Sequence, residues 1–239
     1  RTHRLSHLRC YENVPTLISM FISKRAIITP QFEHAKLAAV IASLWGNKQF
    51  HKPRLPHDSF VKGVLFHDRG FGEHDHYNLI SLSKKERLHT LRQGILKESE
   101  DQISNILTIL HIKRLIAMYP PSDMKEILSL LNISLSRKLK AVKISQEDFM
   151  FADAITEIAD DIAFDFALGE NSKGSVEIIQ DINSRKKTKV HFSIKGSVIT
   201  MKPWPLSVDN YKGFIIGYER KGYPQQRKPH MISFILKSR

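Results

Sequence analysis

The adjacent pair His67-Asp68 is the part of the sequence whose residue types point most directly to chemistry. It ends the apolar run that begins at Ser59, and Arg69-Gly70 follows it. A neutral imidazole nitrogen and a carboxylate oxygen side by side at a helix end can both reach one divalent ion, and these donors suit Fe, Mn, Zn or Mg. The sequence therefore predicts a divalent-metal site around this pair and leaves the identity of the ion open.

His34 is a second candidate ligand. A helix is expected from Pro30 to about Trp45, because Thr29-Pro30 is typical of a helix start and Gly46 of a helix end. Counting by three and four from His34 reaches only apolar residues, which are Leu37, Ala38, Ile41 and Trp45. A histidine on this buried face needs a partner for its ring nitrogens. That partner is either a metal ion or a backbone carbonyl group.

A late helix, expected over 147–168, carries four aspartates among apolar residues: Asp153, Asp160, Asp161 and Asp165. A buried carboxylate is costly unless it is paired or bound to a metal. A helical wheel with Ile155, Ile158 and Ile162 toward the core puts Asp165 near the edge of the buried face. The same wheel puts Asp161 further round and Asp160 outward. The pattern fits either an exposed acidic stripe or a further metal ligand.

Other histidines lie within or close to apolar segments. His74 lies in Phe71-Gly-Glu-His-Asp-His76, where it is expected to be a substrate-facing acid or base, a further ligand, or part of a polar surface loop. His111 lies in the apolar helix expected over 101–118 and therefore faces inward or sideways. His89 lies in a polar helix and is expected to be solvated. The catalytic candidates are Asp68, His74 and His111.

Helical patterns cover roughly two thirds of the chain. The expected helices are 1–23, 30–45, 59–69, 84–98, 101–118, 122–135 and 147–168. After Gly169 the segments are short, β-rich and separated by Gly and Pro, with a hairpin signal at Lys195-Gly196. The expected strands are 24–29, 176–179, 189–194, 197–201, 214–220 and 231–237. We expect a mainly α fold, with a helical domain over 1–170 and a C-terminal antiparallel β element over 171–239 packed on the helical body.

The composition limits the class of protein. With 239 residues, 41% hydrophobic and 26% charged, the chain fits a globular protein and not a disordered one. The single cysteine, Cys10, excludes an internal disulfide and a thiolate-rich zinc site, so metal ligands must be His and carboxylate. No apolar run is long enough to span a bilayer, and no small-residue cleavage site follows Val14–Ile22. We expect a cytoplasmic protein without a membrane partner.

The net charge of +13 indicates anionic partners. These are a small-molecule substrate, such as a nucleotide or phosphate ester, or a nucleic acid. A generally basic surface explains the charge at least as well, because the basic residues are scattered. The densest clusters, Arg137–Lys140 and Arg185–Lys187, do not interleave aromatic residues as a single-strand binding face does. The oligomeric state is not indicated.

The order His34, His67-Asp68 and a late aspartate resembles the ligand pattern H…HD…D of the HD superfamily of metal-dependent phosphohydrolases. Val64 to Gly70 resembles the end of the superfamily's central helix, and Ile158-Ala-Asp-Asp-Ile162 resembles its last ligand segment. The resemblance implies an HD-domain-like helical bundle with a divalent metal. It implies a ligand set that contradicts the helical wheel: His34, His67, Asp68 and Asp160, with Asp161 as second choice.

A near full-length resemblance is to an uncharacterised bacterial family, domain of unknown function 3891. It is carried by Ile27 to Ala35, Trp45-Gly46, His67-Asp68 and Val198 to Leu206. Where that family follows its His-Asp with Gly-Trp and a later Asp, this chain has Arg69-Gly-Phe and Asp75. The family has no assigned reaction, so the resemblance implies a fold and metal ligands but no substrate.

These observations favour a metal-dependent phosphohydrolase or phosphodiesterase. In it Asp68 orients a water molecule, and His111 or His74 completes a second metal site or protonates the leaving group. The candidates for binding phosphate are Arg69, Lys113 and Arg114. A di-iron oxygenase is one alternative, because some HD-superfamily members hold a second metal with extra histidines near the place of His111. The other alternative is a non-catalytic basic module that binds nucleic acid or has a regulatory role.

Overall fold

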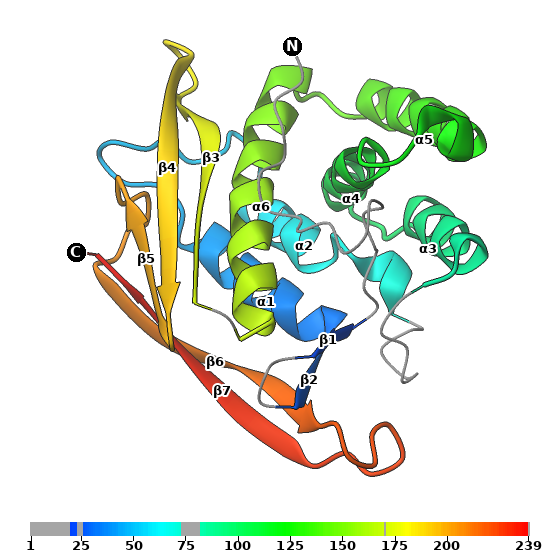
Figure 1. Ribbon diagram of the computed structural model, residues 1–239. Helices are drawn as coiled ribbons and strands as arrows, with labels where there is room; N and C mark the ends of the chain where they lie inside the picture. Colours follow the sequence, from blue (N-terminus) through cyan, green and yellow to red (C-terminus); the bar gives the residue numbers. More distant parts are fainter. Residues whose placement is uncertain (1–19, 23–25, 73–81, 170, 239) are drawn as a thin grey trace.

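The computed structural model describes residues 20–22, 26–72, 82–169 and 171–238 (Figure 1). Its helices are α1 Gln31–Ser43, α2 His57–Leu65, the 3-10 helix η1 Arg69–Phe71, α3 Lys84–Leu96, α4 Gln102–Ile116, α5 Pro121–Ala141 and α6 Gln146–Ala167. These confirm the helices predicted from residue 30 onward. Asp101 caps α4 by accepting hydrogen bonds from two backbone N–H groups. Pro30 is the capping residue of α1, although Thr29-Pro30 is typical of a helix that is capped by the threonine.

Seven strands form one curled sheet in the order β1-β2-β6-β7-β5-β4-β3. They are β1 Met20–Ile22, β2 Ile27–Pro30, β3 Ser172–Asp181, β4 Lys186–Lys195, β5 Val198–Lys202, β6 Asn210–Glu219 and β7 Pro229–Lys237. Neighbouring strands are antiparallel except β5 and β7, which are parallel. The hairpin predicted at Lys195-Gly196 is confirmed. Lys195 pairs with Val198, and Gly196 takes a φ of 59°, which glycine adopts readily.

The expected fold class, mainly α with a C-terminal antiparallel β element, is wrong. The sheet is mixed, includes β1 and β2 from the N-terminal region, and forms a full layer of an α/β fold. Within the helix expected over 1–23, Met20–Ile22 form a strand, and 1–19 lie outside the described residues. Strand β1 has only three residues, which is too short to show a recognisable period. The pairing of β2 with β6, for example of Ile28 with Tyr218, joins distant segments and leaves no local sequence signal. The expected division at residue 170 stays a prediction.

Helix α6 lies between the sheet and the other helices (Figure 1). It contacts β3 and β4 on one side and α1 and α4 on the other. It is therefore buried around most of its circumference, with Phe151, Ile155, Ile158, Ala159 and Ile162 all fully enclosed. Each large apolar side chain buried in this way stabilises the fold by about 1.5–3 kcal/mol. A polar residue on the side of α6 that faces α1 and α4 is enclosed by protein and needs a partner there.

The segment Pro203-Trp204-Pro205 anchors the end of β5 against the helical body. The carbonyl group of Trp204 accepts a hydrogen bond from Asn47 Nδ2 at 2.8 Å, and the N–H of Gly46 donates to the carbonyl of Pro205 at 2.9 Å. The sheet is thereby fixed to the loop that follows α1. Of the helices within the described ranges, none is both long and apolar enough to cross a membrane.

Candidate metal centre

Three segments place four donor side chains at one point of the core. His34 lies near the start of α1, His67 and Asp68 follow the end of α2, and Asp160 lies in the second half of α6. Helix α1 contacts both α2 and α6, which brings these parts of the chain together. Four of the five predicted metal ligands therefore meet in the structure.

The distances between these donor atoms match those expected around one ion. Asp160 Oδ1 lies 3.2 Å from His34 Nε2 and 3.1 Å from His67 Nε2. Asp68 Oδ2 lies 3.4 Å from His34 Nε2 and 3.5 Å from His67 Nε2. Neighbouring ligands held at about 2.1 Å from a common ion are roughly 3.0 Å apart in octahedral geometry and roughly 3.4 Å apart in tetrahedral geometry. Two imidazole nitrogens and two carboxylate oxygens therefore form a donor set that fits a divalent ion.

The turn after α2 sets the direction of His67. The helix ends at Leu65, and the ring Nδ1–H of His67 donates to the carbonyl oxygen of Val64 at 2.6 Å. This hydrogen bond places the proton of the neutral ring on Nδ1 and leaves the lone pair of Nε2 directed toward the carboxylates. The backbone bond thus prepares His67 as a ligand through Nε2.

The site is buried, and its two carboxylates are more exposed than its two histidines. His34 and His67 are each 1% exposed, whereas the side chains of Asp68 and Asp160 are 11% and 19% exposed. A small cavity of about 50 Å³ adjoins Asp68. Its lining residues are Gln31, Phe32, Ala35, Leu65, Phe66, Asp68, Arg69 and Gly72. This volume admits a water molecule or the oxygens of a small anionic group.

The charges at this site stabilise one another. Burial raises the pKa of Asp68 and Asp160, but the neighbouring histidines, His67 foremost, outweigh burial and hold both pKa values below the usual range. Burial likewise lowers the pKa of His67, and the charges of Asp160 and Asp68 reverse this and raise it to about 9. The carboxylates are therefore ionised and His67 is protonated at neutral pH in the metal-free protein. A positive charge is favoured where the four donor atoms converge.

Metal affinity is expected to rise with pH up to about 9. An ion at Nε2 of His67 must displace the proton held there, because the pKa of His67 is raised to about 9. Below that pH one proton leaves per ion bound, so affinity increases roughly tenfold per pH unit and then levels off. Calorimetric titration with Mn²⁺, in buffers of different ionisation enthalpy, measures both the affinity and the proton released. An affinity that does not change between pH 6 and 8 would contradict this expectation.

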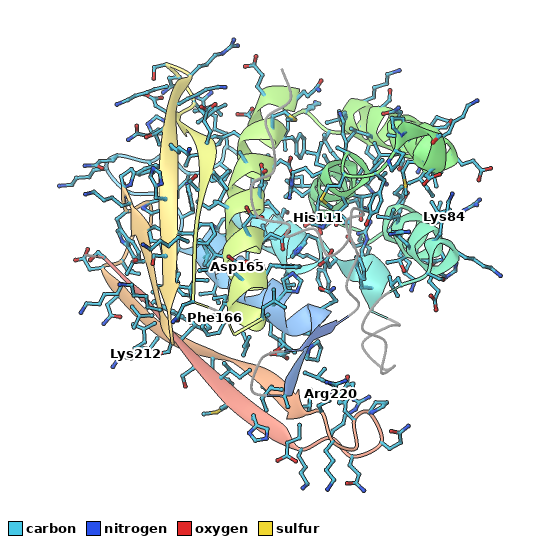
Figure 2. All side chains as sticks on the ribbon, viewed as in Figure 1. Lys84, His111, Asp165, Phe166, Lys212 and Arg220 are labelled. Atoms are coloured by element: carbon cyan, nitrogen blue, oxygen red, sulfur yellow. The ribbon has the colours of Figure 1, made fainter. Side chains whose placement is uncertain are left out.

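His111 of α4 approaches the remaining oxygen atom of each carboxylate, and Figure 2 shows it in the interior of the molecule. Its Nε2 lies 3.0 Å from Asp68 Oδ1, and its Nδ1 lies 3.5 Å from Asp160 Oδ2. Burial lowers the pKa of His111, so its ring is neutral at neutral pH. Donor atoms of His67, His111 and Asp160 all lie within 4.8 Å of one another. These residues form a second group that could hold an ion.

Asp160 faces inward, and the helical wheel that placed it outward is wrong. The wheel assumed that α6 has a single buried face, whereas α6 is covered by the sheet on one side and by α1 and α4 on the other. Asp161 lies outside both groups of metal-ligand atoms among the described residues. Burial and the neighbouring charges of Asp160 and Glu157 raise the pKa of Asp161 to about 8. Asp161 is therefore mostly protonated at neutral pH.

The other predicted residues divide into three groups. His74 lies outside the described residues. His89 and Lys113 are exposed, as expected for His89. Arg69 lines the cavity beside Asp68 and donates from Nε to the carbonyl of Gly94 at 3.1 Å and from Nη1 to Asn105 Oδ1 at 2.7 Å. Arg69 therefore fastens η1 to both α3 and α4.

Sequence reasoning missed the ion pair between Arg114 and Asp153. Arg114 Nη1 bonds to Asp153 Oδ1, and Arg114 Nη2 lies 3.2 Å from His111 Nδ1. The sequence carries only part of the signal for this pair. His111 and Arg114 are three residues apart on α4, and Asp153 and Asp160 are seven apart on α6, so each pair lies on one face of its helix. The arginine belongs to the surroundings of the site and is not free to bind a phosphate.

A model of the family described as "Protein of unknown function (DUF3891)" matches residues 17–217. This span includes all four converging side chains. Comparison with curated proteins and with solved structures gave no match. The match confirms the resemblance to domain of unknown function 3891 and assigns no reaction.

Proposed function

The chain belongs to the DUF3891 family, and we propose from its own residues that it is a metal-dependent phosphohydrolase or phosphodiesterase acting on a nucleotide or another phosphate ester. One observation carries the proposal. His34, His67, Asp68 and Asp160 come from three separate segments and direct donor atoms to one point, at distances of 3.1–3.5 Å. Two histidine nitrogens and two ionised carboxylates that converge at one buried point are a donor set suited to a divalent cation.

The order of these residues supports the same reaction class. His34, His67-Asp68 and Asp160 follow the H…HD…D pattern that resembles the HD superfamily of metal-dependent phosphohydrolases. Mixed nitrogen and oxygen donors suit Fe, Mn, Zn or Mg. A divalent ion held by these four residues supplies Lewis acidity, which activates a water molecule and neutralises charge on a phosphate oxygen.

The remaining residues of the site orient the reactants. Asp68 directs Oδ2 to the histidines His34 and His67, while its Oδ1 accepts a hydrogen bond from His111 at 3.0 Å. Arg69 lines the cavity beside Asp68, and its Nη2 has no hydrogen-bond partner within the described part of the chain. That N–H group is the donor we assign to a phosphate oxygen of the substrate. The net charge of +13 attracts such anions to the surface.

Purified protein loaded with Mn²⁺, Fe²⁺, Zn²⁺ or Mg²⁺ is expected to release phosphate from, or cleave, at least one member of a panel of nucleotides and phosphate esters. The variants His67→Ala and Asp68→Ala should lose bound metal and at least about 100-fold of the rate, because each removes a direct ligand. His89→Ala is the matched control, since His89 is exposed. The proposal fails if the protein binds no metal, or if His67→Ala leaves metal content unchanged.

A di-iron oxygenase is the second candidate, because His67, His111 and Asp160 form a second group of possible metal ligands beside the first. If the protein is such an oxygenase, the protein prepared with iron is expected to bind two ions per chain and to show an optical band that changes on exposure to O₂. A hydrolase that is equally active with Mn²⁺ and lacks this band excludes the oxygenase.

A further inference from the structure

Asp153, Arg114 and His111 form a line of polar contacts that ends at Asp68. Arg114 Nη1 pairs with Asp153 Oδ1, Arg114 Nη2 lies 3.2 Å from His111 Nδ1, and His111 Nε2 lies 3.0 Å from Asp68 Oδ1. The side chains of Arg114 and Asp153 are only 17% and 9% exposed. A buried ion pair of this kind holds its members in a single arrangement, because a break would leave a charge unpaired in the core.

The arginine determines which nitrogen of His111 carries the proton. A guanidinium group has only N–H donors, so His111 Nδ1 accepts the hydrogen bond from Arg114 through its lone pair. The proton of the neutral ring is then on Nε2, and this N–H donates to Asp68 Oδ1. Both ring nitrogens are engaged, one by Arg114 and one by Asp68.

His67 is limited in the same way. Its Nδ1–H is bonded to the carbonyl of Val64, so Nε2 offers the single lone pair with which His67 can bind a metal. That lone pair lies among the donor atoms of His34, Asp68 and Asp160. The two groups of possible ligands share His67. Because a single lone pair can coordinate only one ion, the two groups cannot both hold an ion through His67.

We propose that the centre binds a single divalent ion and that Arg114 enforces this by keeping His111 as a positioning residue for Asp68. This inference rests on the proposed metal site and goes beyond it by excluding the dinuclear arrangement. An ion bound to His111 Nδ1 would lie about 2 Å from that atom, in the space where the positive Arg114 Nη2 stands 3.2 Å away. The hydrogen bond from His111 occupies Asp68 Oδ1 and leaves Oδ2 as the oxygen that faces His34 and His67.

The variant His111→Gln separates a positioning role from a ligand role. A glutamine amide can donate to Asp68 and accept from Arg114, but it is a poor metal ligand. Wild-type protein titrated with Mn²⁺ is expected to bind one ion per chain and to give the electron paramagnetic resonance spectrum of an isolated Mn²⁺ ion. His111→Gln should still bind one ion, with an affinity within about tenfold of wild type, whereas His111→Leu should lose about 10–100-fold.

The double variant Arg114→Leu/Asp153→Leu tests the arginine without leaving a buried charge. It is expected to bind its single ion about tenfold more weakly, because His111 is no longer held. The matched control is Arg185→Leu/Glu147→Leu, which removes an exposed pair and should leave the affinity unchanged.

Three outcomes would count against these proposals, and they are distinguishable. Two Mn²⁺ ions per wild-type chain with magnetic coupling, falling to one in His111→Gln, overturn the single-ion inference and leave the metal site standing. Wild-type affinity in Arg114→Leu/Asp153→Leu overturns the role of Arg114. No bound ion in the wild-type protein overturns the proposed function, and the inference with it.

Discussion

Asp160→Asn is expected to weaken metal binding by at least about 100-fold, whereas Asp161→Asn at the next position retains wild-type affinity. Asp160 Oδ1 lies within hydrogen-bonding distance of both His34 Nε2 and His67 Nε2. An amide in its place removes the negative charge that balances a divalent ion and turns an acceptor group partly into a donor. Asp161 has a pKa raised to about 8 by burial and by Asp160, so its carboxyl group is mostly neutral at pH 7 and asparagine changes little.

Calorimetric titration of both variants with Mn²⁺ at pH 7 measures this difference. The two positions share a helix and a chemical substitution, so a general disturbance of α6 affects both alike. Equal losses in the two variants, or a larger loss in Asp161→Asn, would show that Asp160 is not a ligand.

Gly70→Ala is expected to destabilise the protein by about 3 kcal/mol and to weaken metal binding as well. A Cβ atom at Gly70 would overlap the backbone carbonyl oxygen of Thr90 and lie 3.0 Å from the backbone nitrogen of Gly94. Both atoms belong to α3 and cannot move aside as a flexible side chain does, so the cost lies at the upper end of overpacking effects. Because Asp68 is two residues away, a shift of η1 would also displace this proposed ligand.

Gly94→Ala is the matched control for this close approach. Its Cβ would meet Cδ1 of Ile112 at 2.7 Å, and the end of that side chain can move. Alanine also gains up to about 1 kcal/mol of helix propensity within α3. Denaturation by urea, followed by circular dichroism, should show Gly94→Ala within about 1 kcal/mol of wild type. Similar losses of stability in both variants would mean that the close backbone contact between η1 and α3 is not the reason for the effect of Gly70→Ala.

The parts of the fold that follow local rules were predictable from the sequence. The helix at Pro30, the acid-capped α4 and the Lys195-Gly196 hairpin all carry their signals within a few residues. The sheet was not predictable, because pairing of β2 with β6 joins residues such as Ile28 and Tyr218 and leaves no local pattern. The N-terminal strand β1 was too short to show a period.

The residues of the candidate metal centre were predicted from three signals: their types, the helical spacing around His34 and the family resemblance. His34 was recognised because apolar residues follow it at helical spacing, and the structure buries it as expected. Asp160 was indicated by the resemblance of Ile158 to Ile162 to a ligand segment, against a wheel that assumed one buried face. The hydrogen bond from Arg114 to His111 could not be predicted from the sequence. It depends on the ion pair that orients Arg114, and Asp153, the other member of that pair, lies on a different helix.

The most direct test of the metal centre is an anomalous-scattering map from crystals of the Mn²⁺-loaded protein. We expect one peak per chain, about 2.0–2.3 Å from His34 Nε2, His67 Nε2 and one oxygen of each of Asp68 and Asp160. A map with no peak among these four side chains, or with its peak at other residues, would contradict the account.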